Sequence, residues 1–377
     1  MIDTLIHILA LTAPVAMIFA SLFAFTTWLE RKMLARIQNR IGPNYINIPF
    51  TKFRKTFGLL QPAADGFKML VKEDIVPHGA DRFLHLLAPI LALVPAMMVL
   101  CLLPFDLPFA NESMKRIHAA ALDNAVLLFF GITSINTLAV FMAGWASRNK
   151  YSLLGGMRAV AQMVSYEIPL VLSAAVVIMA VGSLSAQKIV AAQSTHWFIF
   201  TPWGLAAFFI FFIASLAETN RSPFDLPEAE SEIIAGYFTE YSGFKFALFF
   251  LGEYLAIFAI NGLAVTLFFG GGNGPWVQAH PWLSCVWFLA KIFGLIFVII
   301  WLRGTLPRLR VDQLMAFAWK FLMPLSILNL FVAAVALKVQ QPWLTWPLCA
   351  LVLYAAAHGL SRLQQKNVGP RTYQYAE

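Results

Sequence analysis

The stretch AETNRSPFDLPEAESEIIAGYFTEYSGFKFALFFLGEY, from Ala217 to Tyr254, gathers acidic side chains in a chain where charge is scarce. Its acids are Glu218, Asp225, Glu228, Glu230, Glu232, Glu240 and Glu253. Apolar segments long enough to cross a bilayer stand on both sides of it. Because a charged side chain inside a membrane costs roughly 2.5 to 3.5 kcal/mol on insertion scales, several carboxylates at such a place indicate a route for protons or ions.

Helix capping explains part of this acidic stretch. Asp225 and Glu228 fit a capping-box-like D-x-x-E pattern with Pro227 in the first turn, where the helix dipole favours acids. Capping does not explain Glu228 and Glu232, since like charges four residues apart on a helix repel each other. It also leaves Glu253, within FALFFLGEYLAIFAI, unexplained. For the cluster as a whole we favour function over capping and solvation.

The composition indicates a membrane protein and excludes soluble multidomain proteins. The chain is 60% hydrophobic and 12% charged, whereas a soluble domain is close to a quarter charged. Long apolar runs, each near the length that spans a hydrocarbon core, predict an all-α, polytopic transmembrane helix bundle of nine spans. These lie at Ile2 to Leu29, Phe83 to Leu103, Ala121 to Trp145, Val160 to Val181, Pro202 to Ala217, Phe244 to Phe269, Leu283 to Leu302, Phe321 to Leu337 and Trp343 to Leu360.

The distribution of Lys and Arg orients these spans. With the N-terminus outside, 22 of these residues fall on the inside and 4 on the outside, which is a strong positive-inside bias. The acidic stretch and the C-terminus then face the cytoplasm, and the net charge of +8 reflects topology rather than nucleic-acid binding. Asp3 stands where a signal peptide carries basic residues, so we interpret the first apolar run as a retained span.

The first inside loop predicts amphipathic helices at the membrane interface. Phe50, Phe53, Phe57 and Leu60 recur at helical spacing with basic residues between them. After Pro62, ADGFKMLVKED is typical of a second short helix. A lipid-surface anchor and a docking surface for a partner explain these residues equally well.

Single ionisable residues stand well inside three predicted spans. We expect Glu167, Glu253 and Lys291 to face the bundle interior or a wet cavity, where they could exchange protons. A structural ion pair inside the bundle is the alternative. Three amides predict interhelical hydrogen bonds instead: Asn136, Asn261 and Asn329.

The sequence shows no set of metal or cluster ligands. Cys101, Cys285 and Cys349 lie far apart in apolar segments without C-x-x-C spacing, so we interpret them as packing residues. The seven histidines do not pair at metal-ligand spacing. With no nucleotide-binding glycine pattern either, we expect no flavin, iron–sulfur cluster or metal to be bound by this chain.

Five motifs resemble those of a known family. They are ERKMLARIQNRIGPN (Glu30 to Asn44), GLLQPAADGFKMLVKE (Gly58 to Glu73), MRAVAQMVSYEIPLVLS (Met157 to Ser173), the acidic stretch, and IWLRGTLPRLRVDQLMAFAWKFLMPL (Ile300 to Leu325). Together, over roughly Ile2 to Leu337, they resemble the H subunits of bacterial proton-pumping NADH:quinone oxidoreductases, whose mitochondrial counterparts belong to complex I. The chain departs from the shorter family members at Lys338. We therefore expect a family-like domain of eight spans at residues 1–337 and a C-terminal extension at 338–377, with a ninth span and a cytoplasmic tail.

The resemblance implies a junction subunit in the bacterial inner membrane, with a periplasmic N-terminus and a cytoplasmic C-terminus. Its partners would be other membrane-arm subunits, the quinone-proximal soluble subunits, lipid and quinone, which is the substrate. It would form much of the quinone chamber and have no activity when isolated. The proton-path candidates are Glu167, Glu218, Glu228, Glu230, Glu232 and Glu253, to which its position within a span adds Lys291. The candidates for the quinone chamber or its entrance are Arg31, Arg36, Arg40, Arg221 and Asp225, with Arg221 also a partner for the acids.

Quinone reduction consumes two protons and changes the local charge, so nearby carboxylates would respond to each redox step. Three rival functions stay open. A homologous junction subunit of a membrane-bound hydrogenase-type complex need not bind quinone. An ion-coupled transporter usually shows internal repeats, which this sequence lacks. A purely structural anchor leaves Glu167 and Glu253 unexplained.

Overall fold

A computed structural model describes residues 21–44, 57–104, 122–226, 235–277, 279–280, 282–339 and 342–366. All regular secondary structure in these ranges is helical, which confirms the predicted all-α class. A helix at 21–37 comes first. It is followed by α2 (Gln61–Val71), α3 (Arg82–Leu100), α5 (Ala125–Thr133), α6 (Ile135–Ala146), α7 (Lys150–Val181), α8 (Ala186–Ala192), η2 (Phe198–Phe200), α9 (Pro202–Glu218), η3 (Gly236–Phe238), α11 (Gly243–Phe268), α12 (Leu283–Thr305), α13 (Val311–Phe317), the π-helix η4 (Ala318–Leu322), α14 (Met323–Lys338) and α15 (Pro342–Lys366).

The chain is a multi-pass membrane protein. Within the described ranges, six helical segments are long and apolar enough to cross a membrane: Arg82–Leu100, Ala125–Ala146, Lys150–Val181, Gly243–Phe268, Leu283–Thr305 and Val311–Lys338. Each coincides with a predicted span, and the shorter α9 coincides with another. Residues 2–20 of the predicted first span lie outside the described residues. The helix α15 covers the predicted ninth span, whose crossing of the membrane stays a prediction.

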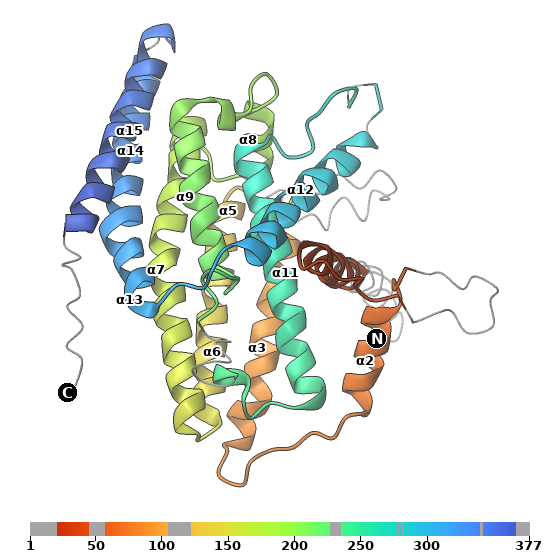
Figure 1. Cartoon of the computed structure of the whole chain (residues 1–377). Coiled ribbons are helices and arrows are strands. Elements are labelled where there is room, and N and C mark those ends of the chain that lie inside the picture. The colour runs from red at the N-terminus through yellow and green to blue at the C-terminus, as the bar shows by residue number, and fades with distance from the viewer. Residues whose placement is uncertain are drawn as a thin grey trace.

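The packing of the helices brings distant chain segments together inside the bundle. In Figure 1, α3, α6, α7 and α11 run beside one another along the bundle, and α14 and α15 pack at its edge. The helix α9 packs on α7 but ends about halfway along it, and α12 runs obliquely past the middle of α11. The helix at 21–37 meets them through Phe23 on Tyr254 and Phe25 on Phe293, with ring centroids 5.4 and 5.2 Å apart. Three chain segments therefore converge at mid-bundle.

Local capping explains where the central helices begin. Asp81 accepts hydrogen bonds from the backbone amides of Phe83 and Leu84 at the start of α3. The helix α7 begins at Lys150, ten residues before the predicted span, because Asn149 caps it and accepts from the amide of Tyr151. It ends at Gly182, which adopts the left-handed conformation that glycine tolerates, with φ of 71°.

The first inside loop is partly as predicted. The second short helix is α2, and it is held to the helix at 21–37 by an ion pair between Arg31 and Asp65. Phe50 and Phe53 lie outside the described residues, but the predicted helix is wrong at 57–60, where the chain forms turns. Phe57 and Gly58 both have positive φ, and a Cβ on Gly58 would lie 2.1 Å from the carbonyl oxygen of Pro43.

The three amides predicted to join helices behave differently. Asn329 on α14 donates to the carbonyl of Trp203 on α9 at 3.1 Å, as predicted. For Asn261 the prediction is wrong, because its amide bonds within α11 to Ile257, one turn earlier. Asn136 lines an interior cavity beside Glu218.

Candidate functional site

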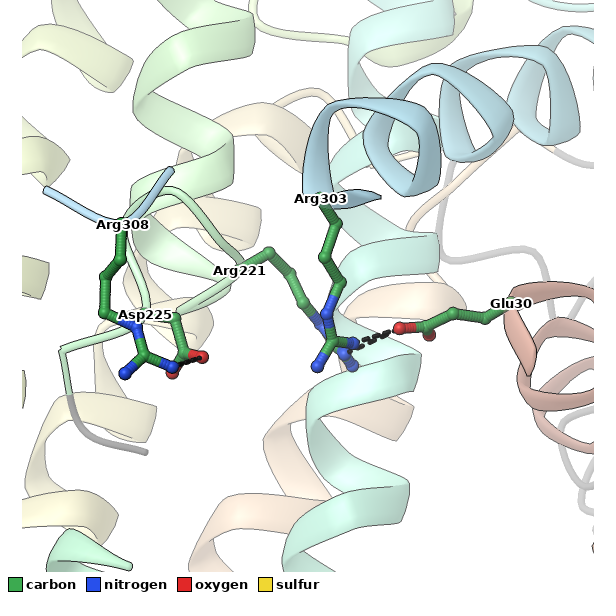
Figure 2. A network of polar contacts seen from close by, with 5 residues as sticks. All are labelled: Glu30, Arg221, Asp225, Arg303 and Arg308. Atoms are coloured by element: carbon green, nitrogen blue, oxygen red, sulfur yellow. Dashed lines mark hydrogen bonds and ion pairs between the residues drawn. The ribbon is translucent and has the colours of Figure 1, made fainter. Parts of the chain in front are cut away.

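The segment after α9 folds into a compact loop at 219–226. Its backbone closes on itself, with the amide of Arg221 bonded to Leu216 at 3.2 Å and that of Phe224 bonded to Arg221 at 2.8 Å. Asn220 takes the left-handed conformation at φ of 49°, which asparagine tolerates better than most residues. The loop turns Arg221 and Asp225 toward different basic and acidic partners, as Figure 2 shows.

Glu30 and two arginines from distant parts of the chain form a buried charge cluster. Arg221 lies 3.5 Å from the Glu30 carboxylate, and Arg303, at the end of α12, bonds to the same oxygen, Oε1 (Figure 2). The side chains of Arg221 and Glu30 are only 7% and 9% exposed. The guanidinium of Arg221 also lies 4.4 Å from the ring centroid of Tyr254, within cation–π range.

The electrostatics of this cluster keep Glu30 ionised. Glu30 follows the last residue of the predicted first span. Its burial by itself raises its pKa, but the charges of Arg221 and Arg303 outweigh this effect and hold the pKa below its usual range. Two guanidiniums facing one carboxylate leave the cluster with a net positive charge.

A small cavity opens beside the Glu30 cluster. Its walls are mainly aliphatic, and its polar groups come from that cluster, from Thr26 and from Tyr254. The lining residues are Thr26, Glu30, Arg221, Tyr254, Ile257, Ile296, Ile299, Ile300 and Arg303. Apolar walls with a few fixed polar donors are typical of a site for a largely apolar molecule that carries hydrogen-bond acceptors.

Asp225 forms a second ion pair on the other side of the loop. Its carboxylate lies 3.2 Å from Arg308, which follows α12, and the Asp225 side chain is 9% exposed. The backbone amide of Leu309 also donates to the carbonyl of Pro223 at 3.1 Å. The loop at 219–226 and the segment that joins α12 to α13 are therefore held together by both side chains and backbone.

Glu218 and Glu253 face a second polar region, deeper among α3, α6 and α11. Two adjoining cavities both include Glu218 and Asn136, and one of them also reaches Glu253 and Tyr237. The Tyr237 hydroxyl donates to Glu253 at 3.0 Å. Glu218 is 6% exposed, and its Oε2 has no hydrogen-bond partner among the described residues. A buried carboxyl oxygen that faces a polar cavity is suited to exchange a proton with water.

The remaining proton-path candidates are distributed unevenly. Glu167, half-buried on α7, is close enough to Glu218 for the two carboxylates to repel each other. Glu228, Glu230 and Glu232 lie outside the described residues. The structure thus brings Glu218 and Glu253 to one cavity, and the place of Glu167 in the path stays a prediction.

Lys291 lies apart from these acids. Its ammonium donates to the backbone carbonyls of Phe269, Gly271 and Asn273 at 2.8, 2.9 and 2.6 Å. It also lies 4.3 Å from the centroid of the Trp197 ring. These contacts hold the chain after α11 and favour a structural role, so its place in the proton path stays a prediction.

The arginines of the first loop do not share one environment with Arg221. Arg31 is half exposed and pairs with Asp65 on α2, and Arg36 and Arg40 are exposed. The ion pair described for Arg221 is with Glu30, and its pairing with the acidic stretch stays a prediction. Only Arg221 and Asp225, of the five quinone-chamber candidates, therefore lie at the buried clusters.

Sequence reasoning missed Glu30, Arg303 and Arg308 as members of the site. Each belongs to a quoted motif, but Glu30 borders a span and the two arginines were counted only for orientation. The available signal was the lone acid at the start of ERKMLARIQNRIGPN. Among the described residues, no group of three or more His, Cys, Asp or Glu side chains could hold a metal ion.

The sequence of the chain matches a known protein family and several of its members. The NADH dehydrogenase family model matches residues 10–334. The H subunit of the NADH-quinone oxidoreductase from Dehalococcoides mccartyi (strain CBDB1) is 48% identical over 335 residues, 89% of this chain and 88% of that protein. The protein of the same name from Geobacillus kaustophilus is 48% identical over 324 residues, 85% of this chain and 92% of the relative. That from Protochlamydia amoebophila is 45% identical over 336 residues, 89% and 98% of the two chains. The chain therefore belongs to the NADH dehydrogenase family.

Proposed function

We propose that this chain is the H-type membrane subunit of a proton-translocating NADH:quinone oxidoreductase in a bacterial inner membrane. Its relatives bear the name of that complex and align over most of both chains. The N-terminus would be periplasmic and the C-terminus cytoplasmic, as the positive-inside bias favours. Its partners would be the other membrane-arm subunits, the quinone-proximal soluble subunits and lipid.

One observation carries the assignment of a quinone path: the charge cluster of Glu30, Arg221 and Arg303 forms one end of an isoleucine-lined cavity. A quinone has an apolar tail and two carbonyl oxygens that accept hydrogen bonds. Guanidinium donors suit those oxygens, and their excess positive charge stabilises the negative charge that arrives with electrons. Since the cavity is small, we propose that it is one wall of a chamber that the neighbouring subunits complete.

Proton movement is assigned to the second polar region. Reduction of a quinone consumes two protons, and the charge change acts on carboxylates nearby. Arg221 and Glu218 stand three residues apart in the chain, but Arg221 faces the proposed quinone wall and Glu218 faces the cavity of Glu253. We propose that Glu167, Glu218 and Glu253 pass protons there, and that Glu228, Glu230 and Glu232 extend the path. The loop at 219–226 would couple the two regions.

The quinone enzyme is favoured over a hydrogenase-type complex, because the three relatives described above are all named for the quinone enzyme. The rival makes a different prediction about partners. We would tag the chain at one terminus, extract native membranes in mild detergent and assay the purified material. Co-purification of inhibitor-sensitive NADH:quinone reductase activity is the expected result. Recovery of a hydrogenase module, or of an intact preparation with no redox partner, would contradict the proposal.

A further inference from the structure

The side chain of Gln162 holds both ends of the loop that joins the two polar regions. Gln162 lies on α7 and is fully buried. Its Nε2 donates to the carbonyls of Ala217 and Phe224, each at 2.7 Å, and lies 3.2 Å from Oδ1 of Asn220. Ala217 directly precedes Glu218, and Phe224 directly precedes Asp225. One amide nitrogen therefore fixes the chain just before the first and last functional side chains of this segment.

The surroundings of Gln162 require a donor at that position. All three neighbouring atoms are acceptors, so the orientation of the amide follows from its partners. The other amide atom, Oε1, is buried and has no hydrogen-bond partner among the described residues. A buried amide that leaves one polar atom unsatisfied is unfavourable for stability alone. We therefore interpret Gln162 by the two hydrogen bonds that its nitrogen donates to the carbonyls of Ala217 and Phe224.

The same face of α7 also contacts α13, the helix that follows Arg308. Tyr166, one turn after Gln162, donates from its hydroxyl to the carbonyl of Leu314 on α13 at 3.0 Å. Its ring lies 5.5 Å from that of Phe224. Thus α7 fixes the loop that carries Arg221 and Asp225 and also the helix that follows Arg308.

We propose that Gln162 is a positioning residue for coupling: its amide nitrogen fixes the loop at 219–226 so that Glu218 faces the proton cavity while Arg221 faces the quinone wall. This inference rests on the proposed function. Without the two bonds, the loop would be free to shift at both ends, and the opposed directions of its side chains would no longer be fixed. A displacement of about 1 Å at a reacting group can cost up to about 100-fold in rate.

Gln193 provides a matched control. It is also fully buried, and its Nε2 also donates to backbone carbonyls of another helix, at 3.0 Å to Thr266 and 3.1 Å to Leu267 on α11. It follows α8, at the end of the bundle opposite to η3 in Figure 1. A Gln193→Leu variant therefore removes the same kind of buried clamp without touching the loop at 219–226.

The test compares Gln162→Leu and Gln193→Leu in the intact, tagged complex. Ferricyanide reduction by NADH, which needs no quinone, reports the content of the peripheral arm, and quinone reduction and proton pumping are normalised to it. We expect Gln162→Leu to lower quinone turnover and pumping by about tenfold and Gln193→Leu to change them less than about twofold. Unchanged turnover and pumping in Gln162→Leu would overturn the proposal, as would equal losses in both variants.

A second variant separates positioning from folding. Gln162→Glu has nearly the same shape but loses both donor hydrogens when ionised, and it regains one when protonated. Its turnover relative to the unsubstituted complex should rise as the pH falls from 8 to 6, whereas the ratio for Gln162→Leu should stay flat. A flat ratio for Gln162→Glu, or failure of both variants to assemble, would overturn the positioning role. If the unsubstituted complex itself reduced no quinone, the proposed function would fail instead.

Discussion

Arg221 and Glu30, 191 residues apart in the sequence, form an ion pair of 3.5 Å in which both side chains are less than a tenth exposed. Arg303, 273 residues after Glu30, bonds to the same carboxylate oxygen. Through these two contacts, Glu30 joins the end of the first predicted span to the loop at 219–226 and to α12. Burying an unpaired charge is strongly destabilising. Glu30, Arg221 and Arg303 therefore depend on one another to remain buried.

Replacing Glu30 should destabilise the complex. Glu30→Gln leaves Arg221 and Arg303 buried without their shared countercharge, and breaking such a buried pair costs about 3 to 5 kcal/mol. The apparent melting temperature of the purified complex measures the effect. The matched control is Asp123→Asn, which breaks the pair of Asp123 with Lys188, whose side chains are 82% and 63% exposed. Such exposed pairs contribute roughly 0 to 1 kcal/mol, so equal shifts in the two variants would contradict the buried role of Glu30.

The effect of Glu30→Gln should not depend on pH between 9 and 5. The pKa of Glu30 lies below its ordinary value of 4.5 because the two arginines outweigh burial. The stability that this carboxylate contributes is therefore complete above pH 4.5 and is lost only as the pH falls through the lower, folded-state pKa. The melting-temperature difference between Glu30→Gln and the unsubstituted complex should stay constant over this range. A difference that shrank between pH 7 and pH 5 would mean that the pKa is raised.

Glu218→Gln should impair proton pumping while leaving the fold intact. The substitution keeps the shape of a buried side chain but removes the carboxyl proton that we propose is exchanged with the cavity of Asn136 and Glu253. Since positioned acids and bases typically contribute 10²- to 10⁴-fold, we expect pumping-linked turnover to fall at least about tenfold. Proton release and quinone reduction would be measured together in proteoliposomes. The exposed Glu73, changed to Gln, serves as the control. Pumping stoichiometry and turnover equal to those of the control would remove Glu218 from the path.

Lys291→Met separates two roles for an intramembrane lysine. The substitution leaves the carbonyls of Phe269, Gly271 and Asn273 without their donor. Each buried acceptor left unsatisfied costs about 1 to 3 kcal/mol, so the melting temperature of the complex should fall. The number of protons pumped per electron should not change in the complex that survives. The opposite result, normal stability with reduced pumping, would support the proton-path assignment of Lys291.

The sequence predicted the helix bundle well because apolar run length directly reports the span of a bilayer. It placed α11 within one residue at each end, since Phe244 to Phe269 is a long, predominantly apolar run. It failed at the start of α7, where Asn149 caps a helix that extends past the apolar run. The spacing of Phe57 and Leu60 predicted a helix that the structure does not form at 57–60. Phe57 and Gly58 have positive φ there, and the spacing of apolar residues does not indicate it.

The site was harder to predict than the fold, because its contacts join distant segments. Glu218 and Glu253 could be singled out because carboxylates stand out beside or within apolar runs, and their place in a proton path stays a prediction. Glu30 and Arg303 were not, since at span ends charged residues are ordinary, and only the tertiary structure brings them together. Gln162 carries no charge, so its sequence context gave no signal of the bonds it makes.

Binding of quinone at the Glu30 cluster is tested most directly by photoaffinity labelling of the intact complex with an azido-quinone that supports turnover. We expect label on this chain, on the segment of α12 that contains Ile296, Ile299 and Arg303, and we expect that label to be lost when excess unlabelled quinone is added. Arg303→Lys should retain some labelling, and Ile299→Trp should block it by filling the cavity. A complex that turns over the probe but carries no competable label on this chain would show that the cavity at the Glu30 cluster is not part of the quinone chamber.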